Sequence, residues 1–204
     1  MKSGYVGVIG RANAGKSTLV NVLVGEKVAI VSPKPQTTRD AIMGVLTKEN
    51  YQIVFVDTPG LYKAKNALSQ SMMKTTQTTA RDVELILFVH DGHAGLSEED
   101  IALIKRYSSG DIPMLIAYTK IDIMPKERIP EDVKKLFDEG IECDVYPVSA
   151  RKGTNLKNLE AAIADILPDG EKVISDDIVS DKSAKFMIAE IMREKILLKY
   201  DKEI

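Results

Sequence analysis

The stretch GRANAGKS, at residues 10–17, constrains the fold of this chain more than any other part of its sequence. It matches the pattern G-x-x-x-x-G-K-[S/T] and follows directly on the apolar run YVGVI, at residues 5–9. The pattern belongs between a strand and a helix, because its backbone N–H groups must turn together toward phosphate oxygens. Gly10 and Gly15 permit that turn, and Lys16 can reach the outer phosphates. An ordinary strand-to-helix turn has no use for the lysine and the serine, so the sequence predicts a nucleoside triphosphate site.

Several hydroxyl and carboxylate groups are candidate ligands for Mg²⁺ next to that loop. Ser17 follows the lysine, and Asp57 ends the apolar run VFVD, where a carboxylate can hold the ion through water. Gly60 of DTPG can offer its N–H to the last phosphate. Thr38 in PQTTRD can complete the metal shell only while that phosphate is present, with Thr37 as the alternative. We therefore expect two loops that the triphosphate orders and hydrolysis releases.

The rest of the chain alternates short apolar runs with helical patterns. The runs are rich in consecutive branched aliphatic residues, which is typical of strands buried on both faces of a sheet. We predict strands at 5–9, 84–90, 113–119 and 143–149, a hairpin within 41–57, and helices at 16–24, 68–80, 97–107, 131–139 and 155–167. This order predicts an α/β fold with a doubly wound, mainly parallel sheet and one antiparallel edge strand. Ligands of such sheets bind beyond the carboxyl ends of the strands.

The stretches TKID and PVSARKG each follow a predicted strand and suggest which base is bound. A carboxylate at Asp122 can accept from both the ring N–H and the exocyclic amine of guanine, whereas adenine offers no such pair of donors. The stem of Lys120 would lie over the base, close to the phosphate loop. Ser149 and Ala150 stand where a backbone N–H can meet the guanine carbonyl. Guanine is therefore the expected base.

Composition excludes several other classes of protein. The chain of 204 residues has a net charge of -2, which gives no support for broad electrostatic binding of nucleic acid. Cys143 is the single cysteine, so a disulfide framework is excluded. No apolar segment has the length of a membrane span, and no secretory signal precedes the first strand. His90 and His93, on either side of Asp91, are interpreted as part of a polar loop rather than a metal site.

The character of the sequence changes after Pro168. Residues 169–182 are acidic and rich in turn formers, as in a linker. A helix is predicted over 183–204, with Asp181 or Ser183 as its cap and with apolar residues near helical spacing at Phe186, Ile188, Ile191, Met192 and Ile196. Its apolar face either packs back on the first domain or begins a second one.

The stretches GRANAGKSTLVN, PQTTRD, DTPGL, TKID and VSARKGTNL, in this order, resemble the translation-factor-related P-loop GTPases. The tail from residue 180 onward resembles the linker and first KH-domain helix of a branch that acts in bacterial ribosome assembly. The resemblance implies a slow GTPase that binds GTP or GDP with Mg²⁺ and acts as a switch in assembly of the 30S subunit. It also implies a GTP-binding domain at 1–168, a linker at 169–182 and, at 183–204, the first helix of an incomplete KH domain.

The resemblance also implies the roles of individual residues. The nucleotide-binding set joins the phosphate loop, the two switch loops and the base-binding stretches: Asn13, Ala14, Gly15, Lys16, Ser17, Thr18, Thr38, Asp57, Gly60, Thr119, Lys120, Asp122, Ser149, Ala150 and Arg151. Lys16, Asn13, Thr38 and Gly60 are expected to act in hydrolysis, and Ser17, Thr38 and Asp57 to hold Mg²⁺.

Two departures from related patterns and one match to them carry expectations of their own. Thr119 stands where the family has an asparagine that ties the base loop to the phosphate loop, and its hydroxyl can supply part of that tie. Leu61 stands where Ras-like enzymes orient water with glutamine. Asn13 resembles an asparagine that coordinates K⁺ in related GTPases, so hydrolysis is expected to be faster in potassium than in sodium.

Expectations about partners follow from the tail. A KH domain clamps nucleic acid with a G-x-x-G loop between helices, and the match GHAG at 92–95 is interpreted as a surface loop of the first domain. We therefore expect 16S rRNA and the 30S subunit to be bound through the missing part of the KH domain, and this chain to bind GTP but not RNA with useful affinity. A cytoplasmic monomer is expected, with peripheral association at the inner face of the membrane as an alternative location. A P-loop ATPase or nucleotide kinase, and a nucleotide-dependent RNA- or ribosome-binding module with incidental hydrolysis, remain open as other functions.

Overall fold

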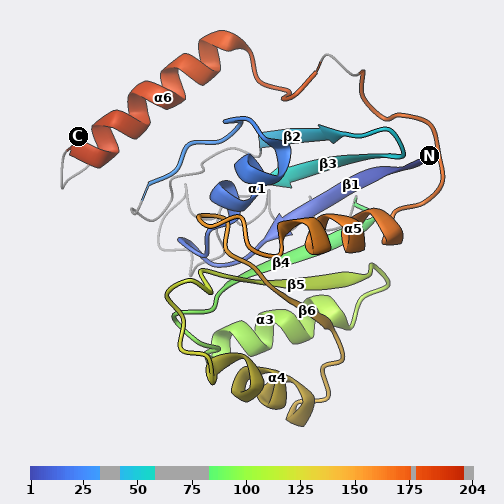
Figure 1. Ribbon diagram of the computed structural model, residues 1–204, viewed down its shortest axis with the longest axis vertical. Coiled ribbons are helices and arrows are strands. Elements are labelled where there is room, and N and C mark those ends of the chain that lie inside the picture. The colour runs from blue at the N-terminus through green and yellow to red at the C-terminus, as the bar shows by residue number, and fades with distance from the viewer. Residues whose placement is uncertain (33–41, 58–82, 176–177, 200–204) are drawn as a thin grey trace.

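Figure 1 shows the computed structural model, which describes residues 1–32, 42–57, 83–175 and 178–199. Its elements follow the chain in the order β1 (Lys2–Ile9), α1 (Lys16–Val24), β2 (Ile42–Thr47), β3 (Tyr51–Asp57), β4 (Leu85–Asp91), α3 (Glu98–Ser108), β5 (Met114–Thr119), α4 (Arg128–Asp138), β6 (Asp144–Pro147), α5 (Leu156–Ile166) and α6 (Ala184–Lys199). Every predicted strand is present, and so is every predicted helix that falls within the described ranges. The helix expected at 68–80 lies outside them.

A six-stranded sheet in the order β2-β3-β1-β4-β5-β6 forms the centre of the molecule. β2 runs antiparallel to β3, with Val45 opposite Val54, and the other neighbouring strands are parallel. The predicted doubly wound, mainly parallel sheet with one antiparallel edge strand is therefore confirmed. The carboxyl ends of the parallel strands share one edge, so the segments that follow β1 and β5 emerge close together there.

Helices cover both faces of the sheet, and each face has its own apolar core. Successive side chains of a strand point to opposite faces, so β4 contributes to both cores. Leu87 packs in one core with Leu19 of α1 and Ile163 of α5, whereas Phe88 packs in the other with Ile104 of α3. This burial on both faces explains why the strands read as continuous apolar runs in the sequence.

Helix α4 begins one turn earlier than its sequence predicts. The helix starts at Arg128 rather than at residue 131, and Pro130 lies inside its first turn. Proline is tolerated there, because the first N–H groups of a helix have no partner within it. The expected boundary after Pro130 was therefore wrong.

The segment expected to be a linker, at 169–182, is hydrogen-bonded to the strands of the sheet. Ser3 N–H donates to Pro168 O (3.0 Å) and Gly170 N–H donates to Met1 O (2.8 Å), beside the start of β1. The side chain of Gln52 on β3 then exchanges two hydrogen bonds with the backbone of Ile174, at 2.7 and 2.9 Å. The acidic, turn-rich composition predicted a linker here, and it did not predict this attachment.

Helix α6 follows, and Figure 1 shows it beside the end of the molecule that holds α1 and β2. Ser183, rather than Asp181, caps it: Ser183 Oγ accepts from Phe186 N–H at 3.3 Å. The buried residues of α6 are Glu194 and Leu197. Of the apolar row that the sequence left either to pack on the first domain or to begin a second one, Ile188, Ile191, Met192 and Ile196 are exposed. None of the helices in the described ranges has the length and apolar content needed to cross a bilayer.

Candidate nucleotide-binding site

The loop between β1 and α1 has a backbone that only glycine can adopt at its critical positions. Gly10 has a φ of 153°, and a Cβ there would lie 2.2 Å from the carbonyl oxygen of Val89. Gly15, which caps α1, has a φ of 95°. Asn13 between them is also left-handed, at 64°, which asparagine tolerates better than most side chains. The loop therefore curves around the amino end of α1, where helix N–H groups and dipole favour an anion.

Lys16 is held inside this curve. Only 6% of Lys16 is exposed, which is rare for a lysine. Its Nζ donates to the carbonyl oxygens of Gly10 (3.2 Å) and Arg11 (3.0 Å). An ammonium group at this position faces the concave side of the loop, where the outer phosphates of a nucleotide would lie.

The loop after β5 is tied to the phosphate loop by the residue that departs from the family pattern. Thr119 Oγ1 lies 2.6 Å from Ala14 O and 3.0 Å from His90 O. A hydroxyl has one hydrogen to donate, so the shorter contact to Ala14 is the tie between the two loops. The partial replacement of asparagine that the sequence suggested is thus present in the structure.

Lys120 makes a second connection between the same two loops. It has a left-handed φ of 61°, and its Nζ donates to Asn13 O at 2.9 Å. The same ammonium group pairs with Asp91 Oδ2 at 2.6 Å, at the end of β4. The sequence placed the lysine close to the phosphate loop, as found, but gave Asp91 no role. The pairing depends on β4 lying next to β5, which places Asp91 opposite Thr119, the residue before Lys120.

Asp122 is oriented by a hydroxyl rather than left free. Ser149 Oγ donates to Asp122 Oδ1 at 2.7 Å, and this hydrogen bond lowers the pKa of the carboxyl, with Arg151 and Lys152 acting in the same direction. The carboxylate is therefore held ionised, as an acceptor for two N–H donors requires.

Of the two residues expected to offer a backbone N–H to the guanine carbonyl, Ser149 uses its N–H elsewhere. The N–H of Ser149 donates to Thr154 O at 3.2 Å, so it is engaged within its own loop. Ser149 contributes through its hydroxyl, which the sequence did not predict, and Ala150 remains the candidate for an N–H directed at the base.

A cavity of about 230 Å³ joins these groups at the carboxyl edge of the sheet. Its lining comes from the phosphate loop, the loop after β5 and the loop after β6: Gly15, Thr18, Thr119, Lys120, Asp122, Ile123, Ala150 and Arg151. Seven of these eight residues were predicted nucleotide ligands, and Ile123 was not. The cavity thus brings these seven predicted ligands, from three separate stretches of the sequence, to one hollow.

The predicted Mg²⁺ ligands are described only in part. Ser17 lies in the first turn of α1, directly after Lys16. The backbone of Asp57 ends β3 in register with Val8 of β1, at the same edge of the sheet as the phosphate loop. Hydroxyl and carboxylate oxygens are the donors that Mg²⁺ prefers, so these two residue types fit the ion. Thr38 and its neighbour Thr37, like Gly60 and Leu61, lie outside the described residues.

The two histidines have separate surroundings. His90 is buried against the ring of Tyr118, with ring centroids 4.8 Å apart, and burial lowers its pKa. His93 Nδ1 lies 3.1 Å from Ile123 O. Among the described residues, no three His, Cys, Asp or Glu side chains are grouped to hold a metal ion. GHAG forms a turn after β4, as predicted.

A family model and several known proteins are similar to this chain in sequence. Residues 5–120 match the family described as 50S ribosome-binding GTPases. The GTPase Era of Caldanaerobacter subterraneus subsp. tengcongensis is 42% identical over 203 residues, which are 100% of this chain and 68% of the relative. The GTPase Era of Clostridioides difficile is 42% identical over 204 residues and is covered to 69%.

Two solved structures share the fold over nearly the full length of the chain. One is Era in complex with MgGDPNP and nucleotides 1506–1542 of 16S ribosomal RNA, with a TM-score of 0.94 and 35% identity, over 100% of this chain and 70% of that one. The other is a variant of Aquifex aeolicus Era bound to GDP·AlF4⁻, with a TM-score of 0.90 and 34% identity, over 98% of this chain and 69% of that one. Both similarities extend beyond residue 168 into α6.

Proposed function

Because this chain belongs to the Era GTPases, we propose that it is a GTP-hydrolysing switch in assembly of the small ribosomal subunit. The observation that carries the proposal is the cavity in which Asp122, oriented by Ser149, lies across from the phosphate loop. A phosphate loop alone would serve many nucleotides, whereas an ionised carboxylate at the base end favours guanine over adenine. This argues against a P-loop ATPase that shares the same loop.

We assign the phosphate and metal contacts as follows. The backbone N–H groups from Asn13 to Thr18 bind the phosphates, and Lys16 neutralises the outer ones. Ser17 and Asp57 hold Mg²⁺ with Thr38, and Gly60 contacts the last phosphate. When bound, Mg²⁺ supplies charge neutralisation to the transferring phosphoryl group.

We assign the base contacts to the other side of the cavity. Asp122 accepts from the guanine N–H groups, and the N–H of Ala150 meets the guanine carbonyl. The stem of Lys120 covers the base, while Thr119 holds the two loops together. Arg151 lies at the rim, where its charge acts on both the carboxylate and the ligand.

Hydrolysis must proceed without a glutamine at position 61. We propose that K⁺ bound with the help of the Asn13 side chain supplies positive charge to the transition state. The rate should then be several-fold higher in KCl than in NaCl, and Asn13→Ala should remove the difference. Equal wild-type rates in the two salts would show that K⁺ has no part in the reaction.

We propose the domain limits of 1–168, 169–182 and 183–204, with α6 as the first helix of a KH domain. The exposed apolar residues of α6 support this assignment, because such a row needs a partner surface. The contact with 16S rRNA would then lie in the KH domain. We also propose a cytoplasmic monomer, with peripheral membrane association as the alternative.

Competition binding tests the central proposal. GDP, GTP and ATP are each titrated against a fluorescent guanine nucleotide with Mg²⁺ present, on the wild type and on Asp122→Asn. The wild type should prefer both guanine nucleotides over ATP. The variant should bind GTP about 100-fold more weakly and xanthosine triphosphate more tightly, because the amide reverses one donor–acceptor pair. Asp138→Asn, an exposed carboxylate at the end of α4, is the matched control. Unchanged GTP affinity in Asp122→Asn would contradict the assignment.

A further inference from the structure

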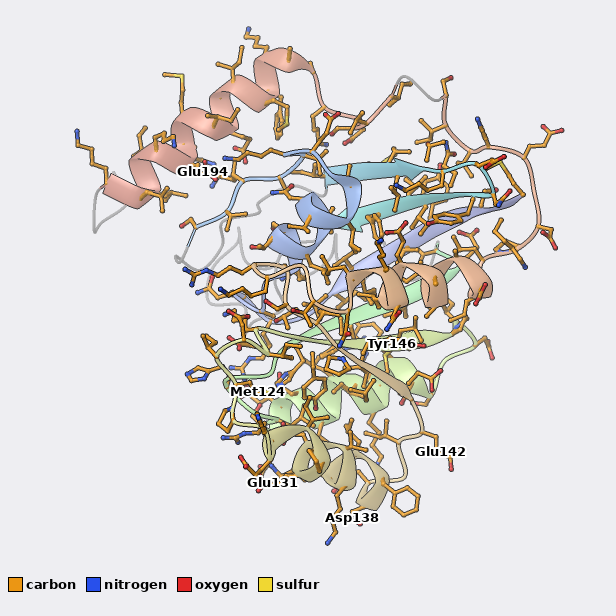
Figure 2. All side chains as sticks on the ribbon, in the orientation of Figure 1. Met124, Glu131, Asp138, Glu142, Tyr146 and Glu194 are labelled. Carbon is orange, nitrogen blue, oxygen red and sulfur yellow. The ribbon has the colours of Figure 1, made fainter. Side chains whose placement is uncertain are left out.

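The turn that follows β4, at residues 91–95, packs against the base loop, residues 120–124, which follows β5. The N–H of Gly92 donates to Thr119 O at 3.0 Å, which continues the pairing of the two strands beyond their last residues. A Cβ at Gly92 would lie 3.0 Å from the same oxygen and 2.5 Å from Sδ of Met124, which Figure 2 labels in the loop after β5. The turn therefore lies directly against the loop that carries the predicted base ligands.

Two side chains of the turn contact the base loop on both sides of Asp122. Asp91 Oδ2 pairs with Lys120 Nζ at 2.6 Å, two positions before Asp122. His93 Nδ1 lies 3.1 Å from Ile123 O, one position after it. A carbonyl oxygen can only accept, so this contact places a hydrogen on Nδ1 of His93. The turn thus holds the backbone on either side of the carboxylate that is assigned to guanine.

Asp91 is itself fixed within the turn. Its Oδ1 accepts from the N–H of His93 at 3.1 Å, and its backbone oxygen accepts from the N–H of Ala94 at 3.0 Å. A hydrogen bond from the backbone two residues on to an aspartate side chain is a common way of stabilising a tight turn. One carboxylate oxygen therefore serves the turn and the other serves Lys120, so the turn and the base loop form one hydrogen-bonded unit.

The cavity gives these contacts a consequence for the ligand. Lys120, Asp122 and Ile123 line it, and the hydrogen bonds of the turn reach the residues on either side of Asp122. A carboxylate that accepts from two N–H groups of one base must be held in a fixed direction, because hydrogen bonds weaken steeply when they are misaligned. Of the residues that the structure describes, Asp91 and His93 are not among those that line the cavity, so their effect on a ligand passes through the base loop.

We infer that Asp91 and His93 are positioning residues for the guanine base. They hold the base loop so that the carboxylate of Asp122 meets both N–H groups of guanine. This inference deepens the proposed function and rests on it, since it needs Asp122 as the guanine acceptor. The exocyclic amine is a donor that guanine has and hypoxanthine lacks. Loss of alignment therefore weakens the binding of GDP more than that of IDP, in which hypoxanthine replaces guanine.

Calorimetry with GDP and with IDP, each with Mg²⁺, tests the inference on the 204-residue chain. The wild type should prefer GDP about 30-fold, because IDP leaves the carboxylate one donor short. Asp91→Ala should weaken GDP about tenfold and IDP about threefold, so that the preference falls about threefold. His93 is more exposed, so His93→Ala should weaken GDP about fourfold and IDP about twofold.

Conservative variants separate positioning from a general loss of stability. His93→Asn keeps an N–H near the place of Nδ1 and should restore most of the affinity and of the preference that His93→Ala loses. Asp91→Asn keeps an acceptor for the N–H of His93 but loses the charge, so its loss should lie between those of the wild type and Asp91→Ala. Should Asp91→Ala fail to fold, the two His93 variants test the inference by themselves, because that side chain is exposed.

Glu139→Ala is the matched control, because it also breaks an ion pair between two elements. Glu139, at the end of α4, pairs with Lys105 of α3 at 3.2 Å, and the variant should leave both affinities unchanged. An unchanged preference between GDP and IDP in either alanine variant would overturn the role of that residue and leave the proposed function intact. A wild type that binds GDP and IDP equally would instead overturn the assignment of Asp122 to guanine, and the inference with it.

Discussion

The phosphate loop and helix α6 are held in place by different kinds of interaction. The loop is fixed by backbone geometry, since Gly10 lies so close to Val89 that no side chain fits between them. Helix α6 is fixed by side chains, through the carboxylate of Glu194 and its two donors, Lys27 and the N–H of Val31. The first arrangement depends on the absence of a side chain. The second depends in part on the charge of one carboxylate, so it is expected to respond to pH.

The largest effect should come from filling the space at Gly10. Gly10→Ala places a Cβ 2.2 Å from a backbone oxygen and strains a φ of 153°, so we expect a loss of about 3 kcal/mol in the free energy of unfolding. Urea denaturation measures this loss. Gly25→Ala is the control: φ is 83°, but a Cβ there has nothing within 4 Å, so the loss should be about 1 kcal/mol. Similar losses in the two variants would contradict the steric argument.

A smaller effect should follow when the tie between the two nucleotide loops is removed. Thr119→Ala deletes the hydroxyl that donates to Ala14 O, and we expect GDP affinity to fall about fivefold, or ~1 kcal/mol. Calorimetry with GDP measures the change. Thr119→Ser keeps the hydroxyl and should bind nearly as the wild type does. If the alanine variant also binds like the wild type, the tie does not contribute to nucleotide binding.

The smallest effect concerns pH and is confined to α6. The pKa of Glu194 is lower in the folded protein than the ordinary value of 4.5. The ionised carboxylate therefore makes its full contribution to the docking of α6 above pH 4.5. The contribution is lost as the pH falls through the lower folded pKa. Hydrogen exchange of α6 amides, corrected for intrinsic rates, should therefore increase at acid pH before the sheet is affected. Glu194→Gln should remove this pH dependence, and a variant that keeps it would assign the effect to another group.

Much of the fold could be predicted because its signals are local. Buried parallel strands read as apolar runs, and glycine with lysine after the first of them defines the phosphate loop and the start of α1. The base ligands Lys120 and Asp122 could also be placed, since each follows a strand whose carboxyl end must lie at the same edge of the sheet. The start of α4 was harder, because Pro130 is compatible with both sides of a helix boundary.

Contacts between distant parts of the chain were not predictable in this way. Ser149 orients Asp122 across 27 positions, and Asp91 pairs with Lys120 across 29. Nothing in the residues around each partner marks such a pair, since serine and aspartate are common in loops. Only the packing of β4, β5 and β6 side by side brings these groups within hydrogen-bonding distance.

The sequence by itself determined the doubly wound sheet, the phosphate loop and the preference for guanine, because each depends on a local pattern of residues with its own stereochemistry. The tertiary structure alone decided which face of α6 turns inward. Hydrophobic periodicity left the place of the isoleucine row open, whereas Glu194 and Leu197 are the residues of α6 that are buried. Glu194 faces the protein because Lys27 and the N–H of Val31 both donate to its carboxylate. A helix pattern shows which residues share a face, and the hydrogen-bond donors and apolar surface of its neighbour together determine which face is buried.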